Sequence, residues 1–168
     1  MQETEQQALR WQPIDDLPNT PCADFGIETP VAGQLKLTVR YSWISGNADR
    51  DLLLTFPDFC GLRVHWDGDA PVVGRIENAP RCESEKFGGF IWPLLHIENP
   101  QWLRAGDFDT SNAIAEGSGQ AEWQQFTVIA LERSVDIIAR LPVTAEWVPG
   151  REWPDLERDW GIVREKAR

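Results

Sequence analysis

The segment Gln34–Trp43 carries the pattern that most constrains the fold. From Leu35 to Trp43 every odd-numbered residue is apolar and every even-numbered residue is polar. Side chains alternate between the two faces of a β-strand, so this pattern predicts a strand with one buried and one wet face. Ser45–Asn47 then has the composition of a turn, and Asp51–Phe56 reads as the return strand of a hairpin.

A second hairpin is expected in the segment Trp123–Leu141. Trp123–Leu131 forms its first strand, Glu132–Ser134 the turn, and Val135–Arg140 the return strand. The run Phe126–Leu131 is apolar on both of its faces, apart from Thr127. Such runs are typical of strands that are covered on both sides, so this hairpin is predicted to lie at the centre of a sheet.

Shorter patterns add further strands, at Leu62–Trp66, Val72–Ile76, Phe90–Ile97 and Val143–Trp147. Pro93 cannot donate to a β-ladder, so its strand should be an edge strand, bulged or split. The predicted fold class is mainly β (a β-rich α+β protein). Three architectures are expected as alternatives: a strongly curved antiparallel sheet, a sandwich or a partly open barrel, each with short peripheral helices.

The length of 168 residues fits one domain, predicted over 1–168. Residues 1–33 are expected to be an irregular lead-in, because prolines interrupt Trp11–Pro21, with at most a helical turn near 3–10. The β core is expected over 34–148, with one helical turn after Asn99-Pro100 and an exposed loop over 106–120. Residues 149–168 are predicted to be a C-terminal helix or tail.

The formal net charge of −11 disfavours several classes of partner. Nucleic acids and anionic membranes are bound by basic surfaces, so neither is expected as a partner. The first residues lack a basic and an apolar region, and no apolar run is long enough to span a membrane, so the predicted location is cytoplasmic. Cys22, Cys60 and Cys82 follow no metal or redox spacing and are predicted to be reduced thiols, with Cys60 in the core.

Nine tryptophans are spread along the chain. Most should fill the core, because indole buries a large apolar area. Those in the irregular termini are candidates for surface or docking positions: Trp11, Trp153 and Trp160.

No motif of a metal or nucleophilic site is strong. His65 and His96 lack ligand spacing, and a zinc ion would need Cys60, Cys82 or a carboxylate brought near by folding. The segment 107–118 begins like a calcium loop, but its sixth and twelfth positions lack the required Gly and Glu. A Cys60–histidine pair has no local support, and a buried structural thiol is the simpler interpretation.

Acidic pairs and glycine pairs are also better explained by turns. Asp67-Gly68-Asp69 has the composition of an ordinary turn, although paired carboxylates could in principle serve acid–base chemistry. Gly88-Gly89 lacks the lysine and hydroxyl residues of a phosphate-binding loop. The sequence therefore predicts no catalytic residue, no metal and no cofactor.

The charge and the lack of catalytic motifs favour a small acidic protein-binding module with a basic protein partner. The leading hypothesis is an immunity protein that neutralises a cognate bacterial toxin by direct binding. The alternatives are a small-ligand-binding β-domain or enzyme with a cavity in the curved sheet, and a structural or assembly subunit. The residues expected to contact the partner are acidic loop residues with one aromatic anchor: Asp67, Asp69, Asp107, Asp109, Glu116 and Trp102.

Overall fold

The structure, a computed structural model, describes residues 5–42, 49–66, 78–104 and 123–150. The elements of these residues are nine strands and one short helix. They are β1 (Gln7–Arg10), β2 (Asp24–Glu28), β3 (Leu35–Arg40), β4 (Arg50–Phe56), β5 (Phe59–Trp66), β6 (Leu94–Glu98), α1 (Gln101–Arg104), β7 (Trp123–Ile129), β8 (Arg133–Arg140) and β9 (Thr144–Pro149).

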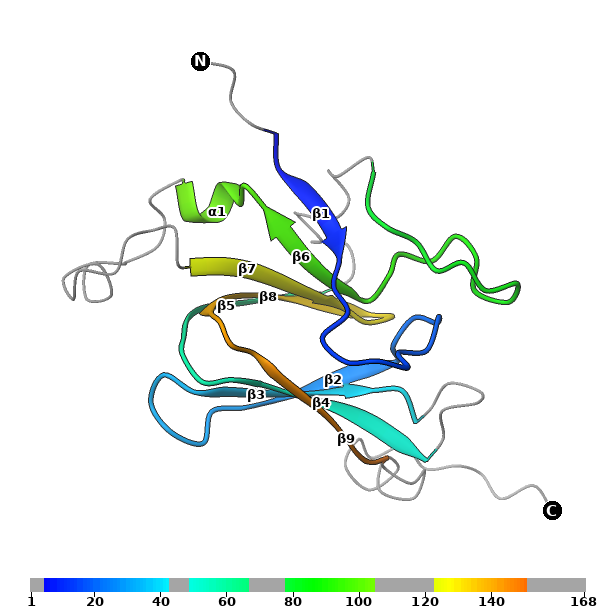
Figure 1. The fold of residues 1–168 in the computed structure, drawn as a ribbon, viewed down its shortest axis with the longest axis horizontal. Coiled ribbons are helices and arrows are strands. Elements are labelled where there is room, and N and C mark those ends of the chain that lie inside the picture. Colours follow the sequence, from blue (N-terminus) through cyan, green and yellow to red (C-terminus); the bar gives the residue numbers. More distant parts are fainter. Residues whose placement is uncertain (1–4, 43–48, 67–77, 105–122, 151–168) are drawn as a thin grey trace.

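The strands form two antiparallel sheets that face one another as a sandwich (Figure 1). The five-stranded sheet has the order β1-β6-β7-β8-β5, and the four-stranded sheet has the order β2-β3-β4-β9. Helix α1 lies on the side of the five-stranded sheet that faces away from the other sheet. The mainly β prediction is confirmed, and of the predicted forms the sandwich fits, because the sheets do not close into a barrel.

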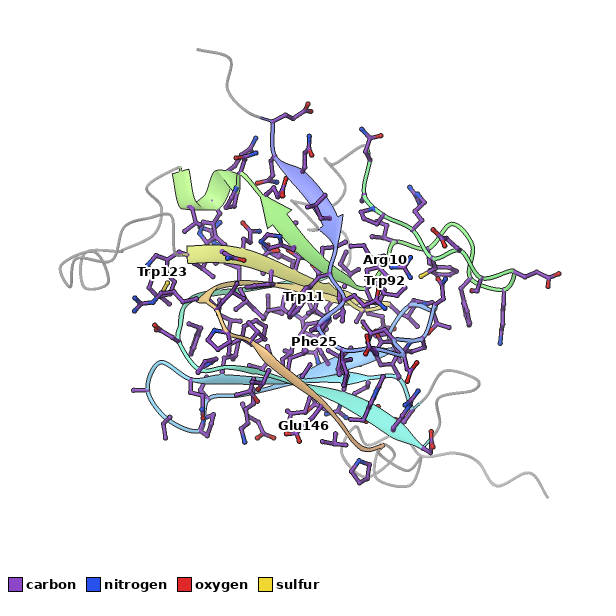
Figure 2. All side chains as sticks on the ribbon, viewed as in Figure 1. Arg10, Trp11, Phe25, Trp92, Trp123 and Glu146 are labelled. Atoms are coloured by element: carbon purple, nitrogen blue, oxygen red, sulfur yellow. The ribbon has the colours of Figure 1, made fainter. Side chains whose placement is uncertain are left out.

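The alternating pattern builds the inner face of the four-stranded sheet. Strands β3 and β4 form the predicted hairpin, with Leu37 opposite Leu54 and Leu35 opposite Phe56. The apolar side chains of these pairs have no solvent exposure. The polar residues between them face outward, where Glu146 of β9 also lies (Figure 2). The period-two pattern of the sequence therefore corresponds to a sheet with one buried and one exposed face, because side chains alternate between the two faces of a strand.

The second hairpin is confirmed as the centre of the other sheet. Strands β7 and β8 pair from Trp123 opposite Arg140 to Ile129 opposite Ser134. Six successive residues of β8, Ser134–Ala139, are buried, so both of its faces are covered. This is the arrangement that the run of apolar residues predicts.

Aromatic side chains and one arginine join the two sheets. The Trp11 ring lies 4.6 Å from the Phe126 ring of β7 and 6.1 Å from the Phe56 ring of β4 (centroid distances; Trp11 is labelled in Figure 2). Arg133 of β8 reaches to β2, where its Nε donates to Asp24 at 2.7 Å and its Nη2 donates to the carbonyl of Phe25. The sandwich is thus held by apolar packing inside and by an ion pair at its margin.

The N-terminal third differs from the sequence-based prediction. The expected irregular lead-in 1–33 contains β1 and β2, so it belongs to the β core, and residues 7–10 are a strand and not a helical turn. Trp11 packs between the sheets and is not a docking residue of an irregular terminus. Short strands with prolines between them carry little periodicity, and their pairing partners lie far along the chain, as β1 pairs with β6.

Pro93 also has a different role from the edge position predicted. It precedes β6, which starts at Leu94 and lies between β1 and β7 inside the sheet. The split strand that was one of the predicted alternatives is observed, because Ile91 forms an isolated bridge with Arg81 before β6 begins. The helical turn after Pro100 is confirmed as α1. The predicted strand 72–76 and the loop 106–120 lie outside the described residues. The predicted C-terminal helix or tail over 149–168 also lies outside them from residue 151 on, and Pro149 is the last residue of β9.

Candidate functional site

The residues predicted to bind a partner fall into two groups. Five of them lie outside the described residues and are not placed: Asp67, Asp69, Asp107, Asp109 and Glu116. Trp102 is described, and it is only 8% exposed. It packs with Leu103, Trp123 and Ile138 in a small cluster, and the guanidinium of Arg63 lies 4.2 Å from its ring centroid. A buried indole under an arginine presents little surface to a partner, so its burial argues against the predicted role of a surface anchor.

An exposed aromatic residue lies instead on β5, the last strand of the five-stranded sheet. Trp66 is 61% exposed, and Val64 on the same face of the strand is 39% exposed. Strand β5 has eight residues, whereas the other edge strands β1, β2 and β9 have four, five and six. A long edge strand with apolar side chains is the kind of edge that proteins usually shorten or protect, which makes this edge a candidate for an interaction site.

The turn between β7 and β8 extends this surface. Trp66 is paired with Arg133, and the two exposed residues that precede Arg133 are Leu131 and Glu132. The charge of Arg133 is engaged by Asp24, and its guanidinium also contacts the rings of Phe25 and Trp66 at 4.3 and 5.6 Å. We call Val64, Trp66, Leu131 and Glu132 the β5 edge surface. It combines apolar contact area with the carboxylate of Glu132, for which the described residues supply no ion-pair partner.

The first residues of β5 are held by a backbone hydrogen bond to the β2–β3 turn. The N–H of Phe59 donates to the carbonyl of Gly33 in the β2–β3 turn at 2.8 Å, and a register shift lies between Phe59 and Gly61. The guanidinium of Arg63 turns back over the outer face of its own sheet, onto Trp102. Strand β5 stays extended and paired with β8 as far as Trp66, so a partner strand could join its other edge.

Neither the family models, nor the curated proteins, nor the solved structures contain a match to this chain. The site must therefore be judged by its own geometry.

The three cysteines are held as neutral thiols. Cys60, which was predicted in the core, is only half-buried at the margin of the Trp102 cluster, whereas Cys22 and Cys82 are buried. Burial raises the pKa of the Cys22 and Cys82 thiols above the ordinary value. Burial, followed by the nearby carboxylate of Asp58, raises the pKa of Cys60 to about 12. Thiols with raised pKa values are poor nucleophiles at neutral pH.

His65 belongs to a polar chain on the outer face of the five-stranded sheet. Its Nε2 lies 3.1 Å from Oδ2 of the buried Asp136, and the hydroxyl of Thr127 donates to Oδ1 of the same carboxylate at 2.5 Å. The chain links β5, β8 and β7. Cys60 lies five residues away along the same strand, about 16 Å at the rise of a β-strand, so the two cannot form a nucleophile–base pair. Cross-strand linkage is the role that this geometry supports.

Within the described part of the chain, no group of three or more His, Cys, Asp or Glu residues could hold a metal ion. No helix of that part is long and apolar enough to cross a membrane. The calcium-like segment 107–118 lies outside the described residues.

Sequence reasoning identified the strand that carries the β5 edge surface but missed the surface itself. The alternation over Leu62–Trp66 predicted the strand correctly. Which strands lie at an edge depends on the order of the whole sheet, and no signal in residues 62–66 reports it. The one local hint was the large aromatic Trp66 directly before a turn-like acidic segment.

Proposed function

We propose that this protein is a protein-binding module that captures a basic partner at the β5 edge surface. The observation that carries the proposal is the exposed Trp66 on a long edge strand. An indole on a rigid backbone is the residue type most often found at the energetic centre of protein interfaces. An extended segment of the partner would pair with the β5 backbone, and its apolar side chains would contact Val64 and Trp66.

The charge of the chain favours a basic partner. The overall charge is −11, and Asp67 and Asp69 follow Trp66 directly in the sequence. Glu132 contributes a carboxylate to the same surface, while the neighbouring Arg133 is paired with Asp24. Lysine or arginine residues of a partner would therefore be attracted by the acidic residues that the sequence places next to this apolar centre. Such complementarity accelerates association and excludes acidic competitors.

An immunity protein is the form of this module that we favour. A toxin that acts on nucleic acid needs a basic groove, and a small acidic protein in the same cytoplasm can block that groove by direct binding. An assembly subunit would use the same edge to bind another component. The immunity protein and the assembly subunit would bind different partners, so the experiment must identify the partner.

The deciding experiment measures binding to the product of the gene adjacent to the one encoding this chain. The purified full-length chain is titrated into that protein by calorimetry, and association rates are recorded at several salt concentrations. We expect a one-to-one complex whose association slows as salt rises. Trp66→Ala should weaken the complex about thirtyfold, as expected for a central aromatic residue of an interface.

The matched control is Phe90→Ala. Phe90 is 47% exposed and lies before β6, away from the β5 edge, so its truncation should leave affinity unchanged. Charge reversal of Asp67 and Asp69 to lysine should slow association and reduce its salt dependence. Binding that is insensitive to Trp66→Ala would refute the β5 edge surface. Self-association of the chain that Trp66→Ala abolishes, without binding to the neighbouring product, would favour the assembly subunit.

A further inference from the structure

Strand β5 lacks the features that protect an edge strand from pairing with another chain. Among the described strands its only neighbour is β8. Its eight residues include neither proline nor lysine, which commonly block such edges, whereas β9 ends at Pro149 and β1 and β2 have four and five residues. The register shift between Phe59 and Gly61 affects only its start. The part from Leu62 to Trp66 is therefore a regular edge that another strand can join.

The order of side chains along this edge is complementary to itself. Val64 and Trp66 share one face of β5, and His65 lies between them on the other face. When two antiparallel copies of β5 pair about a two-fold axis at His65, Val64 of each copy lies opposite Trp66 of the other. Opposite residues of an antiparallel pair have Cβ atoms about 4.5–5.5 Å apart, so an exposed aliphatic side chain would pack on an exposed indole on both sides of the axis.

The same register brings opposite charges together. Arg63 and Glu132 are both exposed, and Glu132 directly precedes Arg133, the residue of β8 that pairs with Trp66. Arg63 of one copy would therefore lie two strands from Glu132 of the other, about 10 Å between Cα atoms, which the two long side chains can bridge. An axis one residue earlier would instead set Arg63 opposite His65 and would join no opposite charges. Charge complementarity thus selects the axis at His65.

We propose that the β5 edge of the free chain is covered by the β5 edge of a second copy, so that two five-stranded sheets form one continuous antiparallel sheet. The contact uses the same surface of both copies, so it closes at a dimer and leaves no edge for a third copy. Because the paired segment is short, the dimer should be reversible.

This dimer would regulate the β5 edge surface. A basic partner that joins β5 must first displace the second copy, so its apparent affinity should fall as the concentration of the chain rises. This regulatory consequence rests on the proposed function, whereas the dimer itself does not.

Sedimentation velocity of the purified full-length chain, over a wide range of concentrations, tests for the dimer. We expect a reversible monomer–dimer equilibrium without larger species. Trp66→Ala should weaken the dimer about tenfold or more, because each indole is lost twice from the symmetric contact. The control Phe90→Ala truncates another exposed aromatic residue, away from the β5 edge, and should leave the equilibrium unchanged.

Exchange of the two charges tests specifically for a second copy in this register. Arg63→Glu and Glu132→Arg each place like charges across the axis, so each should weaken the dimer about tenfold. The double variant Arg63→Glu/Glu132→Arg exchanges the charges and should return the dimerisation constant to within about threefold of the parent. Urea unfolding of all three variants separates weaker pairing from loss of the fold.

A chain that stays monomeric at every concentration overturns the inference. So does a dimer that Trp66→Ala leaves unchanged, or a folded double variant that pairs as weakly as the single variants. Titration with the product of the adjacent gene separates this inference from the proposed function. Binding of that product by a chain that never dimerises leaves the proposed function standing, and a dimer that does not bind it leaves the inference standing. If both occur, a partner affinity that does not depend on chain concentration refutes the regulatory consequence.

Discussion

The ion pair between Arg133 and Asp24 gives the sharpest test of how the two sheets are held together. Arg133 lies on β8 of one sheet, and Asp24 lies on β2 of the other. The Asp24 carboxylate is buried, with a side-chain exposure of 8%, and that of Arg133 is 23%. Arg133→Met keeps an unbranched apolar side chain of comparable length but leaves the carboxylate without its cation.

The expected loss of free energy of unfolding in Arg133→Met follows from the burial of the ion pair. Removing one partner of a fully buried ion pair costs about 3–5 kcal/mol, because the other charge stays desolvated. Partial exposure of Arg133 lets water reach the site, so we expect about 2–3 kcal/mol for Arg133→Met. The double variant Asp24→Asn/Arg133→Met should recover about 1 kcal/mol or more of this loss, because a neutral amide is cheaper to bury than a carboxylate.

Urea unfolding, followed by tryptophan fluorescence, measures these free energies from the transition midpoints. The control is Glu83→Gln, which removes the partner of Arg10 at 3.8 Å in a pair where Glu83 is 76% exposed. Exposed pairs contribute about 0–1 kcal/mol, so this variant should unfold almost as the parent does. The reasoning fails if Arg133→Met is no more destabilising than Glu83→Gln, or if the double variant is less stable than Arg133→Met alone.

Three further predictions concern the core, a close backbone approach and the thiols. Phe126→Ala should lower the free energy of unfolding by about 3–5 kcal/mol in the same urea assay, with the exposed Phe90→Ala as the near-neutral control. Gly150→Ala should cost about 1–3 kcal/mol, because its added Cβ would lie 2.8 Å from the backbone nitrogen of Arg50; unchanged stability would contradict that contact. The raised pKa of Cys60 keeps its thiol neutral, so the folded chain should resist iodoacetamide at pH 8, read by mass spectrometry, and become labelled in urea. Since the pKa of the unfolded thiol is near 9.0 and that of the folded thiol is about 12, stability should fall as pH rises through this window, and less so in Cys60→Ala.

Much of the fold could be predicted from short-range patterns. The alternation that begins at Leu35 and the apolar run that begins at Phe126 are present in the chain itself, and they correspond to strand β3, which ends at Arg40, and to the second half of β7, which ends at Ile129. In each case the physical reason is local: the period of a strand decides which side chains share a face, and burial of one or both faces follows from their polarity.

The candidate sites depended on contacts between distant segments. Trp66 and Trp102 look alike in sequence, yet Trp66 is exposed on an edge strand and Trp102 is covered by its cluster and by Arg63. Gln125 occupies a polar position on a strand, and only the pairing with Ile97 and the packing on that face leave its amide buried and without a hydrogen-bond partner among the described residues.

The sequence by itself determined the class of the protein: an acidic chain of alternating strands with two hairpins. The tertiary structure alone decided the order of the strands, the inclusion of β1 and β2 in the sheets, and the choice of β5 as a long edge. The reason is that local polarity fixes which face of a strand is buried, whereas its neighbours in a sheet are chosen by the packing of the whole chain.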